Sequence, residues 1–322
     1  LSPVVCTQGP GANILMVVLE SWQADMLNAE VMPKTHALAQ NAWQFKQHVS
    51  GGNATVPGMF SLLFGLHASY YDAFRGEPAQ NPSMFTETLN QQHYQSRVFA
   101  SGTFETFSMR PLFFSKVADA DFKYFKTVNT EIEDQKLVTA WSNSLKQTSN
   151  NPRFDFLFLN SSHFPYSSPA SFNQFQPVSE NKSEYMLNRS INPAPLKNHY
   201  RNSLNYLDSL IGQIEQALKS SGKWDNTWVV VVGDHAEEFN ENNLKYWGHV
   251  SNYSRWQTQT PLVVKPAGVF KPMQVQRTSL HQDVVPTLMT YAVGCDGKDI
   301  GQYANGLLLD KLPEHRSTVI GS

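Results

Sequence analysis

An aspartate and a histidine stand side by side at Asp234 and His235, directly after an apolar run that ends at Gly233. Because the chain turns where a strand ends, both side chains can reach one divalent cation, and carboxylate and imidazole groups are common metal ligands. His249 lies fourteen positions after His235 and can fold back over the same place. An Asp-His pair alone is more often part of a solvated loop, so the pair has to be weighed with other residues.

A threonine at position 55 follows the glycine-rich stretch Ser50-Gly-Gly-Asn-Ala and precedes Pro57. Glycine allows a tight turn, and proline suits the first turn of a helix. A helix over residues 59–65 would point its amino end at whatever Thr55 holds, which favours phosphate oxygens. The alternative is that Thr55 only caps the helix. These residues predict either a phosphate-handling hydroxyl or an ordinary helix start.

The elements that must position these residues alternate along the chain. Four continuous apolar runs predict strands buried on both faces, at Asn13–Leu19, Phe154–Leu159, Trp228–Val232 and Pro261–Val264. A helix is predicted between Tyr200 and Leu218, where apolar residues recur every three or four positions. The expected fold is an α/β sandwich with a mainly parallel sheet flanked by helices. Ligands gather beyond the carboxyl ends of such strands, which selects Glu20, the segment Asn160–His163 and Asp234-His235.

Composition limits the class of protein. The 322 residues are 41% hydrophobic and 12% aromatic, which is enough for a large core. The net charge of −2 excludes nucleic acid as a partner held by bulk charge. No run approaches the ~18–20 apolar residues that cross a bilayer. Cys6 and Cys295 are either a long-range disulfide or two free thiols.

The order of these motifs resembles that of the alkaline phosphatase/sulfatase superfamily. Glu20, Thr55, Asp234-His235 and the segment His281–Leu288 occur in the family's order, and the resemblance covers roughly residues 12–310. Residues 55–65 align without gaps with the sulfatase signature around its modified cysteine. The resemblance implies one catalytic domain over residues 12–322, in which the long polar stretch 165–198 is an active-site loop or an insertion.

Thr55 distinguishes branches within this superfamily. Sulfatases need cysteine or serine at this position, because formylglycine cannot form from threonine. A threonine nucleophile resembles instead lipoteichoic acid synthases and lipid A phosphoethanolamine transferases. That resemblance implies a metal site made of Glu20, Thr55, Asp234 and His235. It implies one divalent ion, Mn²⁺ or Zn²⁺, with Mg²⁺ or Ca²⁺ as further options.

The residues around Thr55 are also similar to the periplasmic domain of YejM-type inner-membrane proteins of Gram-negative bacteria. This similarity implies a periplasmic domain of a bacterial inner-membrane protein, joined through residues 1–11 to an upstream membrane region. Members of that group often lack intact metal ligands. Because this chain keeps Asp234 and His235, we expect chemistry rather than regulation alone.

Further roles follow residue by residue from the resemblance. His163 and His249 are expected to contact the phosphoryl group or protonate the leaving group. Arg110 and Asn53 are assigned to substrate binding, Arg110 as a surviving anion-binding fork. The aspartate that helps hold a second metal in alkaline phosphatases would lie just before His163, where this chain has Leu159 and Asn160. One metal ion is therefore expected.

The sequence thus predicts a metal-dependent phosphotransferase or phosphoesterase that uses Thr55 on phospholipid or lipopolysaccharide headgroups. Two alternatives stay open. The domain could sense lipid or lipopolysaccharide without turnover, or it could hydrolyse sulfate esters without formylglycine.

Overall fold

The computed structural model describes residues 4–6, 11–77, 81–105, 109–179, 187, 191–296, 300 and 304–321. Its main feature is an eight-stranded sheet in the order β10-β2-β9-β6-β1-β5-β3-β4. The strands are β1 Asn13–Leu19, β2 Trp43–Val49, β3 Gln95–Ser101, β4 Phe122–Phe125, β5 Arg153–Leu159, β6 Thr227–Gly233, β9 Leu262–Lys265 and β10 Met273–Leu280. A second, two-stranded sheet pairs β7 Glu238–Phe239 with β8 Trp247–Gly248.

The register of the central strands aligns their carboxyl ends. Leu19, the last residue of β1, pairs with Leu159 of β5 on one side and with Gly233 of β6 on the other. The three strands are parallel, so the residues that follow them leave the sheet at the same level. The main-chain connections after β1, β5 and β6 therefore meet at one edge of the sheet, as the sequence predicted for α/β proteins.

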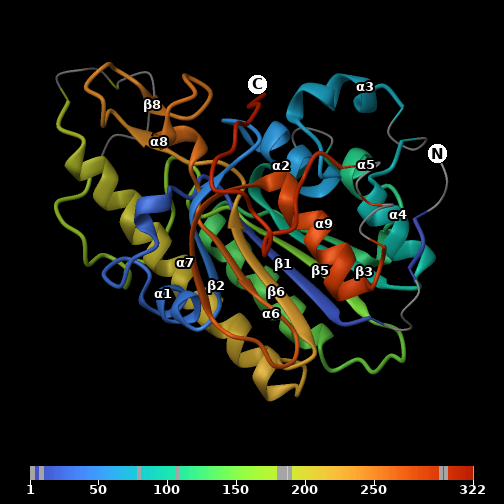
Figure 1. Ribbon diagram of the computed structural model, residues 1–322. Coiled ribbons are helices and arrows are strands. Elements are labelled where there is room, and N and C mark those ends of the chain that lie inside the picture. Colours follow the sequence, from blue (N-terminus) through green and yellow to red (C-terminus); the bar gives the residue numbers. More distant parts are fainter. Residues whose placement is uncertain are drawn as a thin grey trace.

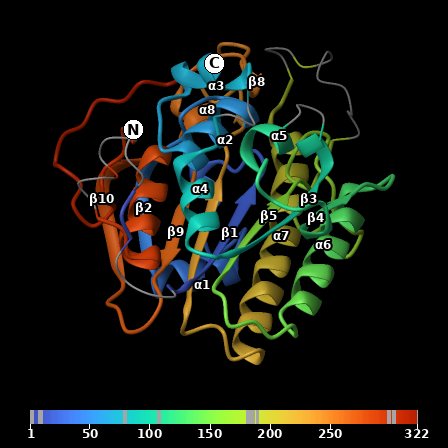
Figure 2. The same ribbon diagram turned by 90° about the vertical axis from the view of Figure 1, so that its right-hand side faces the viewer.

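Helices cover both faces of the sheet. They are α1 Pro33–Gln40, α2 Thr55–Phe64, α3 Tyr71–Arg75, α4 Met84–Gln91, α5 Met109–Phe113, α6 Thr130–Ser144, α7 Ala194–Ser220, α8 Arg255–Thr258 and α9 Val284–Leu288. Short 3-10 turns lie at residues 24–26, 68–70, 102–105, 119–121 and 281–283, and a π-helical turn at 289–293. Figure 1 shows α1, α6 and α7 on one side of the sheet and α2, α4, α5 and α9 on the other. In Figure 2, α6 and α7 run side by side.

The alternation of side chains along β1 explains the two cores. Ile14, Met16 and Val18 belong to the core beneath α2, α4, α5 and α9, whereas the intervening residues face α1, α6 and α7. All of these β1 side chains are buried. Burying a side chain of this size contributes roughly 1.5–3 kcal/mol. The site-bearing strand is consequently fixed from both faces.

The predicted strands and the long helix are confirmed, and the mainly parallel α/β fold is also confirmed. Strands β2, β3, β4 and β10 were not predicted, because polar residues interrupt the apolar runs in these segments. Strand β10 lies at the sheet edge and leaves several side chains exposed. Strand β9 is antiparallel to both neighbours, β2 and β6. Parts of the predicted linker 1–11 and of the predicted insertion 165–198 lie outside the described residues.

Two further findings concern the chain as a whole. Cys6 and Cys295 form a disulfide across 289 positions of sequence, which resolves the alternative left open above. The segment nearby is also held by main-chain bonds, because Asp296 N–H donates to the carbonyl of Val5. Among the described helices, none has both the length and the apolar character that crossing a bilayer would require.

Candidate active site and metal centre

Thr55 is the first residue of α2, and its hydroxyl faces the end of β1. Thr55 Oγ1 lies 3.2 and 3.3 Å from the two carboxylate oxygens of Glu20 and 3.5 Å from Nε2 of His235. The residue that caps α2 is Ala54, and no side chain makes a capping hydrogen bond there. The Thr55 hydroxyl therefore contacts acidic and basic groups from two strand ends, and capping does not account for its position.

Asp234 and His235 follow β6 and complete a buried group with Glu20. His235 Nε2 lies 3.0 Å from Glu20 Oε1 and 3.5 Å from Asp234 Oδ2. Asp234 Oδ1 accepts hydrogen bonds from the main-chain N–H groups of Ser21 and His235. Asp234 Oδ2, by contrast, is buried and has no hydrogen-bond partner. A buried carboxylate oxygen without a donor is costly, and a bound cation would satisfy it.

The electrostatics of this group agree with a cation site. Burial raises the pKa of Glu20, but the hydrogen bond and charge of His235 outweigh burial and hold that pKa well below its usual value. Burial and the adjacent Glu20 carboxylate raise the pKa of Asp234 well above its usual value. Burial lowers the pKa of His235, yet Asp234 and Glu20 outweigh it and raise the pKa to about 10. A proton on His235 balances carboxylate charge, and a divalent cation would replace that proton.

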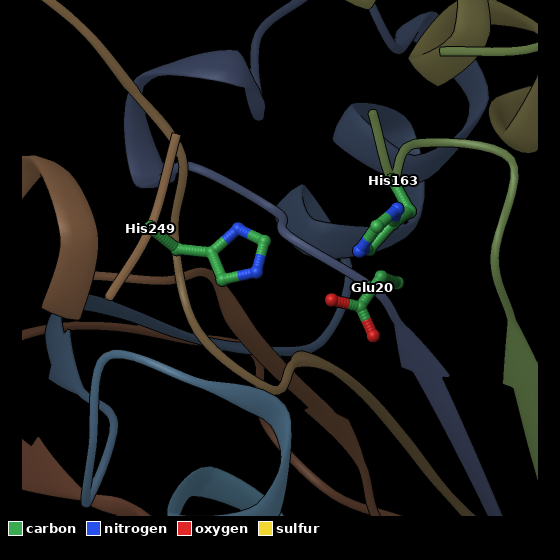
Figure 3. Close-up of side chains that lie close together, drawn as sticks. All are labelled: Glu20, His163 and His249. Atoms are coloured by element: carbon green, nitrogen blue, oxygen red, sulfur yellow. The ribbon is translucent and has the colours of Figure 1, made fainter. Parts of the chain in front are cut away.

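His163 and His249 approach the same carboxylate from two loops (Figure 3). With Glu20 they offer three ligand atoms that all lie within 4.8 Å of one another, as do those of Glu20, Asp234 and His235. The His249 ring centroid is 5.5 Å from that of His163 and 4.4 Å from that of His235. Glu20 is thus shared by two groups of potential metal ligands. A single ion was expected because no aspartate precedes His163. The group made of Glu20, His163 and His249 contains no aspartate and does not need one. The number of ions therefore stays a prediction.

All three histidines are oriented through Nδ1. Nδ1 of His235 lies 2.9 Å from the carbonyl of Ala236, and Nδ1 of His163 lies 2.7 Å from that of Phe164. A carbonyl only accepts hydrogen bonds, so Nδ1 must carry the proton in both rings. When such a ring binds a cation, its lone pair is on Nε2. Such tethering of the remote nitrogen is the arrangement that orients metal-bound histidines.

His249 is tethered by a carboxylate that the sequence did not identify. Glu237 is fully buried, and its Oε2 lies 2.9 Å from Nδ1 of His249. Its other oxygen accepts a 2.6 Å hydrogen bond from the hydroxyl of Tyr166. Burial raises the pKa of Glu237, but the hydrogen bond and charge of His249 outweigh burial, and the pKa lies below its usual value. The signal in the sequence that could have identified Glu237 is its position, three residues after Asp234.

The two predicted substrate-binding residues lie in different surroundings. Asn53 is buried beside Thr55 in the chain; its carbonyl accepts a hydrogen bond from Val250 N–H, and its amide donates to the carbonyl of Asn252. Arg110 forms an ion pair with Asp119, and its guanidinium lies 4.4 Å from the ring centroid of Phe122. Asn53 therefore joins the Thr55 loop to the His249 loop, whereas Arg110 is engaged with the start of β4. Both substrate roles stay predictions.

Comparison with known proteins agrees with this geometry. The model of the sulfatase family matches residues 12–295. The inner membrane protein YejM of Salmonella typhimurium is 23% identical over 281 residues, which cover 87% of this chain and 42% of that protein. Lipoteichoic acid synthase 2 of Bacillus subtilis is 25% identical over 332 residues, which cover 96% of this chain and 48% of that protein. The chain thus spans less than half the length of these two relatives.

A solved structure shows the same fold at low sequence identity. The C-terminal periplasmic domain of EcEptC from Escherichia coli, in complex with zinc, superposes with a TM-score of 0.72 at 16% identity. The match covers 92% of this chain and 87% of that one.

Proposed function

The chain belongs to the sulfatase family, and from that premise we propose that it is a metal-dependent phosphotransferase or phosphoesterase that uses Thr55 on the headgroups of envelope lipids. The observation that carries the proposal is the position of the Thr55 hydroxyl, between the Glu20 carboxylate and His235. A threonine cannot become the formylglycine of sulfatases. A direct attack on phosphorus by its oxygen is the chemistry that this position supports.

Glu20, Thr55, Asp234 and His235 would hold the divalent ion. The fit rests on Asp234 Oδ2, a buried oxygen that accepts no hydrogen bond, and on a donor set of oxygens with one imidazole. A cation bound there supplies charge that lowers the pKa of an adjacent hydroxyl and stabilises phosphoryl oxygens. Mn²⁺ and Zn²⁺ both suit these ligands, and the zinc complex of the E. coli domain favours zinc.

The chain's own residues then divide the reaction between them. The Thr55 hydroxyl gives its proton to the Glu20 carboxylate, which accepts its hydrogen bond. Thr55 Oγ1 forms a bond to phosphorus, and the bond from phosphorus to the leaving oxygen breaks. His163 or His249, protonated on Nε2, gives a proton to that leaving oxygen. The amino end of α2 points main-chain N–H groups at the transferred phosphoryl group. Water, or the hydroxyl of a second substrate, takes the phosphoryl group from Thr55.

The names of the relatives support a lipid substrate and a place at the bacterial inner membrane. The matched proteins include an inner membrane protein, a lipoteichoic acid synthase and a periplasmic domain. We infer that this chain is the periplasmic domain of an inner-membrane protein. Phospholipid and lipopolysaccharide headgroups are the expected substrates.

The test combines metal analysis with turnover. The purified domain is stripped with a chelator, loaded with Mn²⁺ or Zn²⁺, and assayed on bis(4-nitrophenyl) phosphate and on phospholipid vesicles. We expect phosphodiester cleavage that depends on the metal. A protein that binds neither ion and cleaves nothing would support lipid sensing without turnover. Preferential cleavage of 4-nitrophenyl sulfate would support sulfate ester hydrolysis instead.

A further inference from the structure

We propose that Asp134, a carboxylate on α6, is the positioning residue that holds His163 in the candidate active site. The inference rests on the proposed function, because it assigns the support of a group that acts in that reaction. Asp134 itself is not among the potential metal ligands found in the described part of the chain. Its role would be exerted through the turn that carries His163.

Asp134 is fully buried and accepts hydrogen bonds from one strand and one turn. Its Oδ1 accepts a 2.5 Å bond from the hydroxyl of Ser101, at the end of β3. Its Oδ2 accepts bonds from Ser161, one from the main-chain N–H at 2.8 Å and one from the hydroxyl at 2.5 Å. The N–H of Asn160 lies 3.1 Å from both oxygens. The carboxylate thus accepts hydrogen bonds from the first two main-chain N–H groups that follow β5.

The turn continues from these residues directly to His163. Its N–H donates a 3.0 Å bond to the carbonyl of Asn160. Between them, the hydroxyl of Ser162 donates to the main-chain carbonyl of Glu20. One end of the turn is therefore tied to α6 through Asp134, and its middle is tied to Glu20, the first residue after β1. This double attachment sets the distance between the His163 ring and the Glu20 carboxylate, which Figure 3 shows turned toward each other.

Replacing one carboxylate oxygen of Asp134 should therefore displace His163, although Asp134 does not contact the His163 ring. An amide at position 134 accepts with only one oxygen and presents an NH₂ group to donors on the turn. Buried N–H groups that lose their acceptor are unfavourable, so the turn would shift to find other partners. A displacement of about 1 Å can reduce catalysis about 100-fold. The expected result is a loss of proton donation with the Thr55 group intact.

Asp208 provides a matched control. It is also a buried carboxylate on a long helix, α7, and it also accepts main-chain N–H bonds, from Lys34 and Thr35 at the start of α1. It also accepts the hydroxyl of Thr35. The contacts of Asp208 hold α1 and involve none of the candidate site residues. Asp208→Asn removes the same kind of clamp from a different place.

The test measures kcat and KM of Asp134→Asn, Asp208→Asn, His163→Ala and the Asp134→Asn/His163→Ala double variant. Each is assayed on a nitrophenyl phosphodiester, whose leaving group needs little protonation, and on an alkyl phosphodiester, glycerophosphoethanolamine. For Asp134→Asn we expect kcat on the alkyl diester to fall about 10–100-fold, with a much smaller loss on the nitrophenyl diester. The double variant should match His163→Ala. If Asp134→Asn folds poorly, Ser161→Ala takes its place, because it deletes one of the hydroxyl donors to Asp134. Its kcat on the alkyl diester should also fall more than its kcat on the nitrophenyl diester, but by a smaller factor.

A readout independent of turnover separates this inference from the proposed function. In protein labelled with ¹³C-histidine, the ring signal of His163 is assigned by its loss in His163→Ala. We expect Asp134→Asn to shift that signal and Asp208→Asn to leave it in place. Equal losses on both diesters, additive effects in the double variant, or an unmoved His163 signal would overturn the positioning role. A moved signal in a protein without any turnover would support positioning and contradict the proposed function.

Discussion

Two regions of the candidate site are built in different ways. Glu20, Asp234 and His235 leave adjacent strands of a buried sheet, and all three are fully buried. His163 and His249 lie on loops and are partly exposed, and each loop is held by side chains remote in sequence. Topology alone brings the first group together. The second depends on individual hydrogen bonds, so single substitutions should weaken it without dismantling the first.

The largest effect is expected from Thr55→Ala. If Thr55 is the nucleophile, turnover should fall by roughly 10³-fold or more while the domain stays folded and binds metal. Thr55→Ser keeps the hydroxyl and should retain measurable activity. Steady-state kinetics with metal analysis checks both variants. Wild-type rates in metal-loaded Thr55→Ala would exclude a covalent mechanism. Asp234→Ala is the control for an emptied metal site.

The disulfide should matter for stability and not for either half of the site. Cys6→Ser/Cys295→Ser is expected to lower the free energy of unfolding by roughly 2–5 kcal/mol, because the bond closes a loop of 289 positions. Urea titration measures the loss. The rate constant at 25 °C should be unchanged in protein that remains folded. A selective loss of turnover would show that the N-terminal segment reaches the site.

His281 should make the free energy of unfolding depend on pH. This buried ring donates from Nε2 to the carbonyl of Gly233 at 3.0 Å, and the N–H of Gly51 lies 3.4 Å from Nδ1. It thus joins the residue before Asp234 to the loop before Thr55. Burial lowers the pKa of His281 from 6.5 to about 4 despite hydrogen bonds to the backbone.

The sign of the effect follows from proton binding. Between pH 4 and 6.5 the unfolded chain binds more protons at this ring than the folded chain does, so stability rises with pH through this window and is lost as pH falls. The shift corresponds to about 3 kcal/mol. The difference in unfolding free energy between wild type and His281→Gln should change by about that amount from pH 7 to pH 4.

The smallest of these effects is expected from Glu237→Gln. Replacing the carboxylate that orients His249 should lower kcat roughly 10–100-fold, with Thr55 and the strand-end ligands in place. Tyr166→Phe removes only the hydroxyl that donates a hydrogen bond to Glu237. The loss of kcat in this variant should be several-fold smaller. Activity assays at saturating metal check the pair. Equal losses in the two variants would mean that the tether to His249 is not what matters.

These differences also explain what the sequence could predict. Continuous apolar runs identify β1, β5 and β6, and parallel topology then places Glu20 and Asp234 together without further information. Asp134 and Glu237 could not be found in this way. Asp134 lies in a charged helical stretch whose burial depends on packing against β3, and Glu237 is one of two adjacent glutamates. Their partners are 26 or more and 12 positions away, so no local pattern records the contact.

The disulfide also has a mechanical consequence. A tension applied to the chain before Cys6 would reach the fold at Cys6 and pass through the covalent bond to Cys295, which lies beyond the last strand of the sheet. Strand β1, although only a few residues further along, would carry little of that load. Strand β1, which precedes Glu20, would thereby be shielded from a pull on the chain ahead of Cys6. Reduction of the bond would redirect such a pull onto the central strand and the candidate site that follows it.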